Sequence, residues 1–166
     1  MSDTDSKQPI WKSAIIPVAV AALSIGGTLG GMFLQDRFDV LGTQRDLVIQ
    51  YMDDAETSAE SVEAVIADIF DDLSNPDSQL TSERVKNLRK AMLDLRRSSE
   101  RVAVQSGATE GEFKRYSSSM ANLVEIAHRT SGPGDADDLV EAVAVFLASK
   151  RRFEEEVASS YGRSSG

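Results

Sequence analysis

Four basic side chains between residues 86 and 101 have the spacing of one helix face. Lys86, Lys90, Arg97 and Arg101 are separated by steps of four, seven and four residues, which the 3.6-residue period of an α-helix brings into a single stripe. Such a stripe attracts the phosphates of lipid headgroups or nucleotides, or an acidic partner protein. The plainer interpretation, and the one we favour from the sequence, is a solvated polar face.

The segment Glu125-Ile126-Ala127-His128 contains a Glu-x-x-His motif. On a helix its two polar side chains share one face, as in the di-iron carboxylate bundles. That site requires two copies of the motif and two further glutamates, but His128 is the only histidine in the chain. The motif therefore does not predict a metal centre within one chain, and a site shared by two chains has no further support. We interpret His128 as a residue near the C-terminal end of a helix, where a cation is mildly favoured.

The remaining candidates for chemistry are carboxylates, which cluster at residues 53–56 and 71–72. On a helix they mostly take outward positions rather than forming a pocket that would separate their pKa values. The sequence contains no calcium-binding loop, phosphate-binding glycine loop or nucleotide fingerprint. Cysteine is absent, which excludes disulfides and thiol nucleophiles. The sequence predicts neither an enzyme nor a bound cofactor or metal.

Charge is unevenly distributed along the 166-residue chain, whose formal net charge is -9. Residues 36–79 contain twelve acidic and two basic side chains, whereas residues 80–106 contain three acidic and seven basic ones. General nucleic-acid binding is disfavoured, because an acidic chain repels phosphates. An acidic segment therefore precedes a basic one.

Residues 13–35 form an uncharged run of 23 residues between Lys12 and Asp36. A helix of this length spans the hydrocarbon core of a bilayer, which is about 30 Å thick. A cleaved signal peptide is the alternative, with an A-x-A sequence at 19–21, but apolar residues continue past any plausible cleavage site. We predict a short N-terminal tail at 1–12 and a single transmembrane helix at 13–35, in a bacterial inner membrane. Basic residues flank the helix equally, so its orientation stays open.

The second half of the predicted transmembrane helix is rich in glycine. Gly26 and Gly30 form one GxxxG motif, and Gly27 and Gly31 form another that overlaps it. Small residues four positions apart allow two membrane helices to approach closely, although glycine is also common in membrane helices generally. The four glycines predict a packing face for a second copy of the chain or for another membrane protein.

Beyond the predicted anchor, apolar residues recur at alternating steps of three and four, the pattern of helices that pack along a seam. The four runs cover residues 48–73, 85–102, 113–127 and 139–157. Pro76 separates the first run from the second. We predict an all-α fold, in which the transmembrane helix precedes an antiparallel, coiled-coil-like four-helix bundle at 36–158. The Ser/Gly-rich tail at 159–166 is expected to be flexible.

Local signals mark the ends of these helices. Thr81 is expected to cap the start of the second helix, and Gly107 to end it. Thr109 and Glu112 match a capping box at the start of the third helix. Asp135 takes the N-cap position of the fourth helix.

Charged residues that flank the seams predict the register of the first hairpin. With a turn near residue 77, Glu63 lies opposite Arg89 and Glu56 opposite Arg96. Each exposed pair of this kind contributes only about 0–1 kcal/mol, so the pairs select a register more than they stabilise it.

The layout resembles that of single-span proteins with helical bundles, including bacterial sensor ectodomains, although the second span usual in those sensors is missing. The leading hypothesis is a non-enzymatic, membrane-anchored accessory or scaffold protein. It would contact membrane lipid and associate with a second copy or another membrane protein, through the glycine-rich helix and the bundle surface. The alternative is a sensor-effector, whose bundle binds an anionic ligand through the four basic residues and whose oligomerised anchor perturbs the membrane.

Overall fold

The computed structural model describes residues 42–74 and 80–163 of the chain. The elements are α2 (Gly42–Ser74), α3 (Ser82–Ser106), α4 (Glu110–Arg129), the short 3-10 helix η1 (Pro133–Asp135) and α5 (Ala136–Arg163). Four α-helices and no strand occur in these two ranges, so the predicted all-α class is confirmed for them. The predicted N-terminal tail and the transmembrane helix at 13–35 lie outside the described residues.

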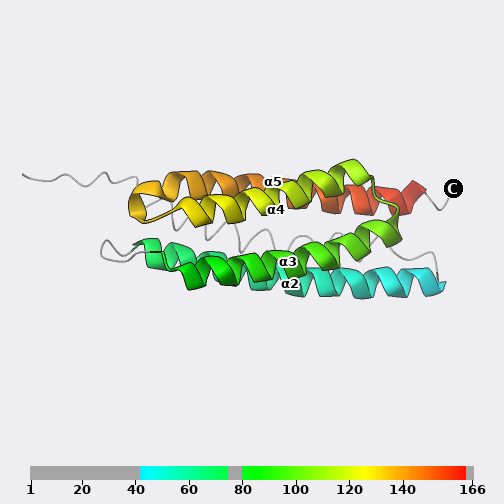
Figure 1. Ribbon diagram of the computed structural model, residues 1–166. Coiled ribbons are helices and arrows are strands. Elements are labelled where there is room, and N and C mark those ends of the chain that lie inside the picture. The colour runs from blue at the N-terminus through cyan, green and yellow to red at the C-terminus, as the bar shows by residue number, and fades with distance from the viewer. Residues whose placement is uncertain (1–41, 75–79, 164–166) are drawn as a thin grey trace, which may run out of the picture.

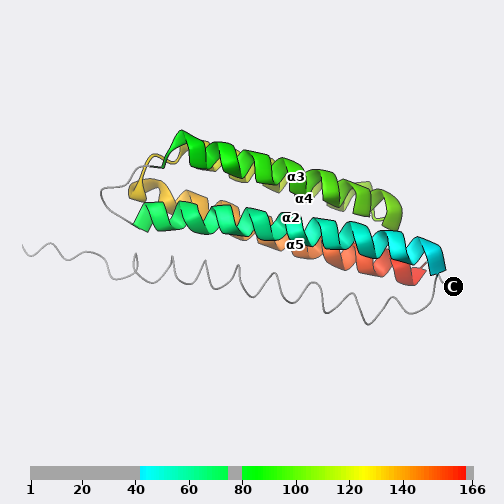
Figure 2. The same ribbon diagram turned by 90° about the horizontal axis from the view of Figure 1, so that it is seen from below.

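The four helices form a bundle of two hairpins (Figure 1). α2 pairs with α3 and α4 pairs with α5, and each helix runs opposite to the one before it. Figure 2, seen from below, shows α3 and α4 in one layer and α2 and α5 in the other. α2, with 33 residues, is about 50 Å long at 1.5 Å per residue. The helical bundle predicted from the four apolar runs is therefore confirmed.

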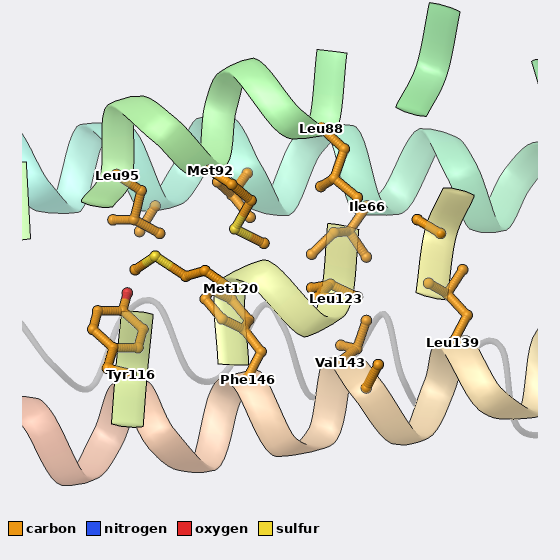
Figure 3. Close-up of a cluster of buried hydrophobic side chains, with 14 of the residues drawn as sticks. Ile66, Leu88, Met92, Leu95, Tyr116, Met120, Leu123, Leu139, Val143 and Phe146 are labelled. Carbon is orange, nitrogen blue, oxygen red and sulfur yellow. The ribbon is translucent and has the colours of Figure 1, made fainter. Parts of the chain in front are cut away.

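Each helix buries the seam that its apolar spacing predicts. Ile66, Leu88, Leu123 and Val143 come from the four different helices and lie together in the core (Figure 3). Full burial of such a side chain stabilises the fold by about 1.5–3 kcal/mol. Phe70 is also fully buried, although it lies beside the predicted seam rather than on it. The apolar stripe of α2 therefore widens toward the turn.

Two of the predicted helix ends are confirmed. The backbone N–H of Arg84 donates to the Thr81 side chain at 3.3 Å, so Thr81 caps α3. Gly107 follows α3 in the left-handed conformation, with φ at 67°, which glycine adopts without the steric cost that a Cβ imposes.

Two other caps differ from their predictions. Thr109 lies at the N-cap of α4 but makes no side-chain capping hydrogen bond: the backbone N–H of Glu112 donates to the Thr109 carbonyl oxygen at 3.2 Å, and the Glu112 carboxylate accepts from Arg115 at 2.6 Å. Asp135 precedes α5, but its carboxylate accepts from the N–H and hydroxyl of Ser131 and thus closes the preceding loop. α5 extends to Arg163, beyond the predicted start of the flexible tail at 159.

The predicted ion pairs of the first hairpin are wrong, although one observed pair fits their register. Arg84 of α3 contacts Asp68 and Asp72 of α2 at 2.6 and 3.0 Å, and Asp68 is the position that the predicted register places opposite it. Glu63 contacts Lys150 of α5 instead of Arg89. Arg89 and Arg96 are both exposed, and neither has an ion pair to the described part of α2.

The physical reason is that each helix of a four-helix bundle has two neighbours. One flank of its seam faces the hairpin partner, and the other flank faces the adjacent hairpin. Glu63 lies on the flank of α2 that faces α5, whereas Asp72 lies on the flank that faces α3. The spacing of charges along a single helix does not show which flank faces which neighbour.

The two glycines that border the α3–α4 turn make a matched test of this backbone. Gly107→Ala should lower the free energy of unfolding by about 1–2 kcal/mol, because an alanine Cβ disfavours a positive φ. Gly111→Ala, inside the first turn of α4, should raise it by about 0.5–1 kcal/mol. An added Cβ meets no atom within 4 Å at either position, so packing does not obscure the difference. Urea unfolding of the full chain in detergent, followed by circular dichroism, measures both changes in stability. Equal effects of the two substitutions would contradict the left-handed conformation assigned to Gly107.

Candidate functional site

The four predicted basic residues lie together on the outer side of α3, and we call them the basic face. Lys86, Lys90, Arg97 and Arg101 are all exposed. Arg97 has a loose ion pair with Asp94 at 3.6 Å. The other three have no ion pair to any described residue, so their charge is available to a partner outside the bundle.

The core packing of α3 explains why these four residues point outward. Leu88, Met92 and Leu95 occupy the opposite side of the helix and are at most 3% exposed, and Figure 3 shows them directed toward α2 and α4. The capped start of α3 and its left-handed end at Gly107 fix the extent of the helix. The basic face is therefore a rigid surface rather than a mobile loop.

Two exposed apolar side chains accompany the basic face. Leu93 is 46% exposed and Val104 is 78% exposed. They follow Lys90 and Arg101 by three residues each, so they share the side of α3 that carries the bases. The sequence analysis did not identify them, although the steps of three and four that join them to the bases were visible. Their presence turns a plain charged surface into an amphipathic one.

A second polar feature lies between the two hairpins. Lys150 occupies a seam position of α5, and its side chain is only 12% exposed. Its Nζ lies 3.6 Å from a carboxylate oxygen of Glu63 on α2 and 3.8 Å from one of Glu154 on α5. Glu63 and Glu154 are themselves 18% and 29% exposed. We call these three residues the lysine cluster.

Burial shifts the pKa values of the two glutamates in this cluster. It raises the pKa of Glu63 from its ordinary value, and the charge and hydrogen bond of Lys150 only partly oppose this rise. Burial likewise raises the pKa of Glu154, again against the charge of Lys150. The charges of Glu56 and Glu63 raise the pKa of Glu154 further, because one lysine cannot neutralise several carboxylates.

An aromatic stack lies beside the lysine cluster. The ring of Tyr116 is stacked on Phe146 and Phe153, with centroid distances of 5.8 and 5.3 Å. Tyr116 is 1% exposed, and burial raises the pKa of its hydroxyl, while a hydrogen bond with Ser99 acts in the opposite direction. Tyr116 therefore stays neutral and serves packing.

The other candidates from the sequence do not form a site. His128 is exposed near the end of α4, and Glu125 forms an ion pair with Arg129 rather than facing a metal. Among the described residues no group of three or more potential ligands could hold a metal ion. Of the carboxylates at 53–56 and 71–72, Asp72 pairs with Arg84.

The glycine-rich face predicted in the membrane, Gly26, Gly27, Gly30 and Gly31, falls outside the described residues. In the part of the chain that is described, none of the helices is both long and apolar enough to span a bilayer. Comparisons with known protein families, with curated proteins and with solved structures found no match to this chain. The basic face is thus the surface on which a functional proposal can be built.

The lysine cluster makes stability depend on pH. A glutamate with a raised pKa in the folded chain binds protons more readily there than in the unfolded chain. The contribution of these glutamates to the free energy of unfolding is therefore fully present below the usual carboxyl pKa. It is lost as the pH rises through their raised pKa values. As the pH rises above the ordinary carboxyl pKa of about 4, Glu63→Gln combined with Glu154→Gln should reduce this negative slope, measured by urea unfolding at a series of pH values.

The slope is the deciding quantity, because the substitutions also remove the partners of Lys150 and so shift the stability at every pH. Glu141→Gln is the matched control: Glu141 is exposed on the same helix as Glu154 and is not among the groups that shift the pKa of Glu63 or Glu154. Its slope should equal that of the wild type. Parallel curves for the double variant and the wild type would contradict the role assigned to the cluster.

Proposed function

We propose that this chain is a non-enzymatic, membrane-anchored interaction protein whose bundle presents the basic face of α3 to a protein partner. The observation that carries the proposal is the surface itself: Lys86, Lys90 and Arg101 are exposed without an ion pair to a described residue, beside the exposed Leu93 and Val104. Interfaces combine apolar contact with charge complementarity in this way. The buried charges of the lysine cluster serve packing between helices, so they need no catalytic explanation.

The uncharged run at 13–35 supports the anchoring part of the proposal. An anchor confines the bundle to the membrane surface, where a weak contact is multiplied by high local concentration. The glycine-rich half of the run would supply a second contact, inside the bilayer.

Charge reversal on the basic face tests the interaction. In the full chain, purified from its native membrane in mild detergent, Lys86→Glu with Lys90→Glu should release co-purifying protein, with about tenfold less retained. Lys114→Glu with Arg152→Glu makes the same change of net charge on exposed positions of α4 and α5 and should retain the partner. Release by both variants would point to net charge alone and would count against the basic face.

The anchor is tested separately by replacing Gly26, Gly27, Gly30 and Gly31 together with Ile. Branched side chains prevent close approach of membrane helices, so the oligomer size and the set of co-purifying membrane proteins should change. Ala21→Ile with Ala22→Ile adds bulk to the same uncharged run and is the control that should leave both unaltered. Unchanged behaviour of the glycine variant would reduce the segment to a passive tether.

A second candidate function rests on the same unpaired bases. In a sensor-effector, the basic face would bind a small anion or an anionic lipid headgroup, and the oligomerised anchor would perturb the membrane. Binding of the full chain to a nucleotide or to anionic vesicles, lost at high salt and in the Lys86→Glu, Lys90→Glu variant, would favour it. If the full chain binds neither the nucleotide nor the vesicles, the sensor-effector proposal fails and the interaction-protein proposal stands.

A further inference from the structure

The side of α2 opposite its core seam is as acidic as that of α3 is basic. Four exposed carboxylates make up this acidic face: Asp53, Glu60, Asp68 and Asp71. Their steps of seven, eight and three residues place them on one side of the helix. No lysine or arginine occurs between residues 46 and 74, so the stretch of α2 that carries this face contains no basic residue.

The acidic and basic faces match in length. The acidic face extends from Asp53 to Asp71, and the basic face with its apolar residues extends from Lys86 to Val104. Each covers about 27 Å at 1.5 Å per residue. Five turns of one helix could therefore lie along five turns of the other.

The two faces cannot satisfy each other within one copy. Both point away from the core, because the opposite sides of α2 and α3 carry the buried seams. Of the four carboxylates, only Asp68 has an ion pair with a described residue, and its partner is Arg84 rather than a member of the basic face. Each copy thus displays two complementary surfaces on adjacent helices.

We propose that the basic face of α3 docks on the acidic face of α2 of a second copy of this chain. Leu93 and Val104 would then be withdrawn from water, and the exposed Ala64, between Glu60 and Asp68, leaves room for an apolar side chain. Because the contact joins two different surfaces, one copy takes part in two such contacts. The inference rests on the proposed function and names its partner.

The contact is weak on its own. A single helix-on-helix contact buries less than the total of about 1,200 Å² that marks stable complexes, and exposed ion pairs contribute little individually. Association of the bundles therefore depends on confinement in the membrane, which raises the effective concentration. It also depends on salt, since exposed charges are screened beyond about 8 Å at physiological ionic strength.

Disulfide trapping in membranes tests the contact directly, since the chain has no native cysteine. One tagged full-length copy carries Arg97→Cys, and a differently tagged copy carries Glu60→Cys. Mild oxidation should give a mixed disulfide between the tags. Glu155→Cys, on an exposed position of α5, replaces Glu60→Cys in the control and should give about tenfold less.

Charge exchange then separates a specific contact from random collision. Lys86→Glu with Lys90→Glu in the Arg97→Cys copy should reduce the mixed disulfide by about tenfold. Asp68→Lys with Asp71→Lys in the Glu60→Cys copy should restore it, because in the antiparallel contact these two positions lie opposite residues 90 and 86, while Arg84 keeps its ion pair with Asp72. Absence of rescue, or a yield that the first reversal does not change, overturns the proposal.

The two proposals fail in different ways. If Lys86→Glu with Lys90→Glu releases some other protein while the mixed disulfide is unchanged, self-docking is overturned and the interaction protein stands. If anionic vesicles or inorganic phosphate suppress the disulfide of the wild-type pair at constant ionic strength, the face belongs to an anionic ligand, and self-docking is again overturned.

Discussion

Neither hairpin of this bundle can bury its apolar seam without the other. The seam of α2 and α3 is covered by α4 and α5, and the stacking of Tyr116 on Phe146 and Phe153 fills the space between α4 and α5. Pairing of the hairpins therefore determines which side of every helix meets water. The outward direction of the basic face is a consequence of Leu88 and Leu95 pointing inward, not of any interaction among the bases themselves.

The same constraint explains the lysine cluster. A lysine at a seam position is costly to bury unless carboxylates meet it, and Lys150 meets one from the opposite hairpin and one from its own helix. Glu63 can play this part only if α2 lies next to α5. The cluster therefore favours this arrangement of the hairpins over one in which α2 and α4 are neighbours, although the pairs contribute little net stability.

Periodicity was enough to predict the helices, their seams and the ends at Thr81 and Gly107, because these depend on residues close in sequence. The partners of charged residues could not be predicted in this way. Glu63 and Arg89 have suitable spacing for a hairpin pair, but the flank of α2 that carries Glu63 faces α5, a relation set by packing of distant segments. The exposure of Leu93 and Val104, by contrast, follows from the predicted seam of α3, because both residues lie off that seam.

Opposite charges on α2 and α3 would ordinarily be attributed to the hairpin that joins them. Arg84 reaches across that hairpin to Asp72 and Asp68; among the described residues, the other three carboxylates of the acidic face and the four bases of the basic face make no ion pair across it. The remaining exposed charge on each of the two helices is therefore not needed to hold one bundle together. In the proposed arrangement, with two copies held side by side in one membrane, α3 of one would run antiparallel to α2 of the other, as it does within the hairpin. The antiparallel pairing of an acidic α2 with a basic α3, which forms the hairpin inside one bundle, can thus also form between two bundles.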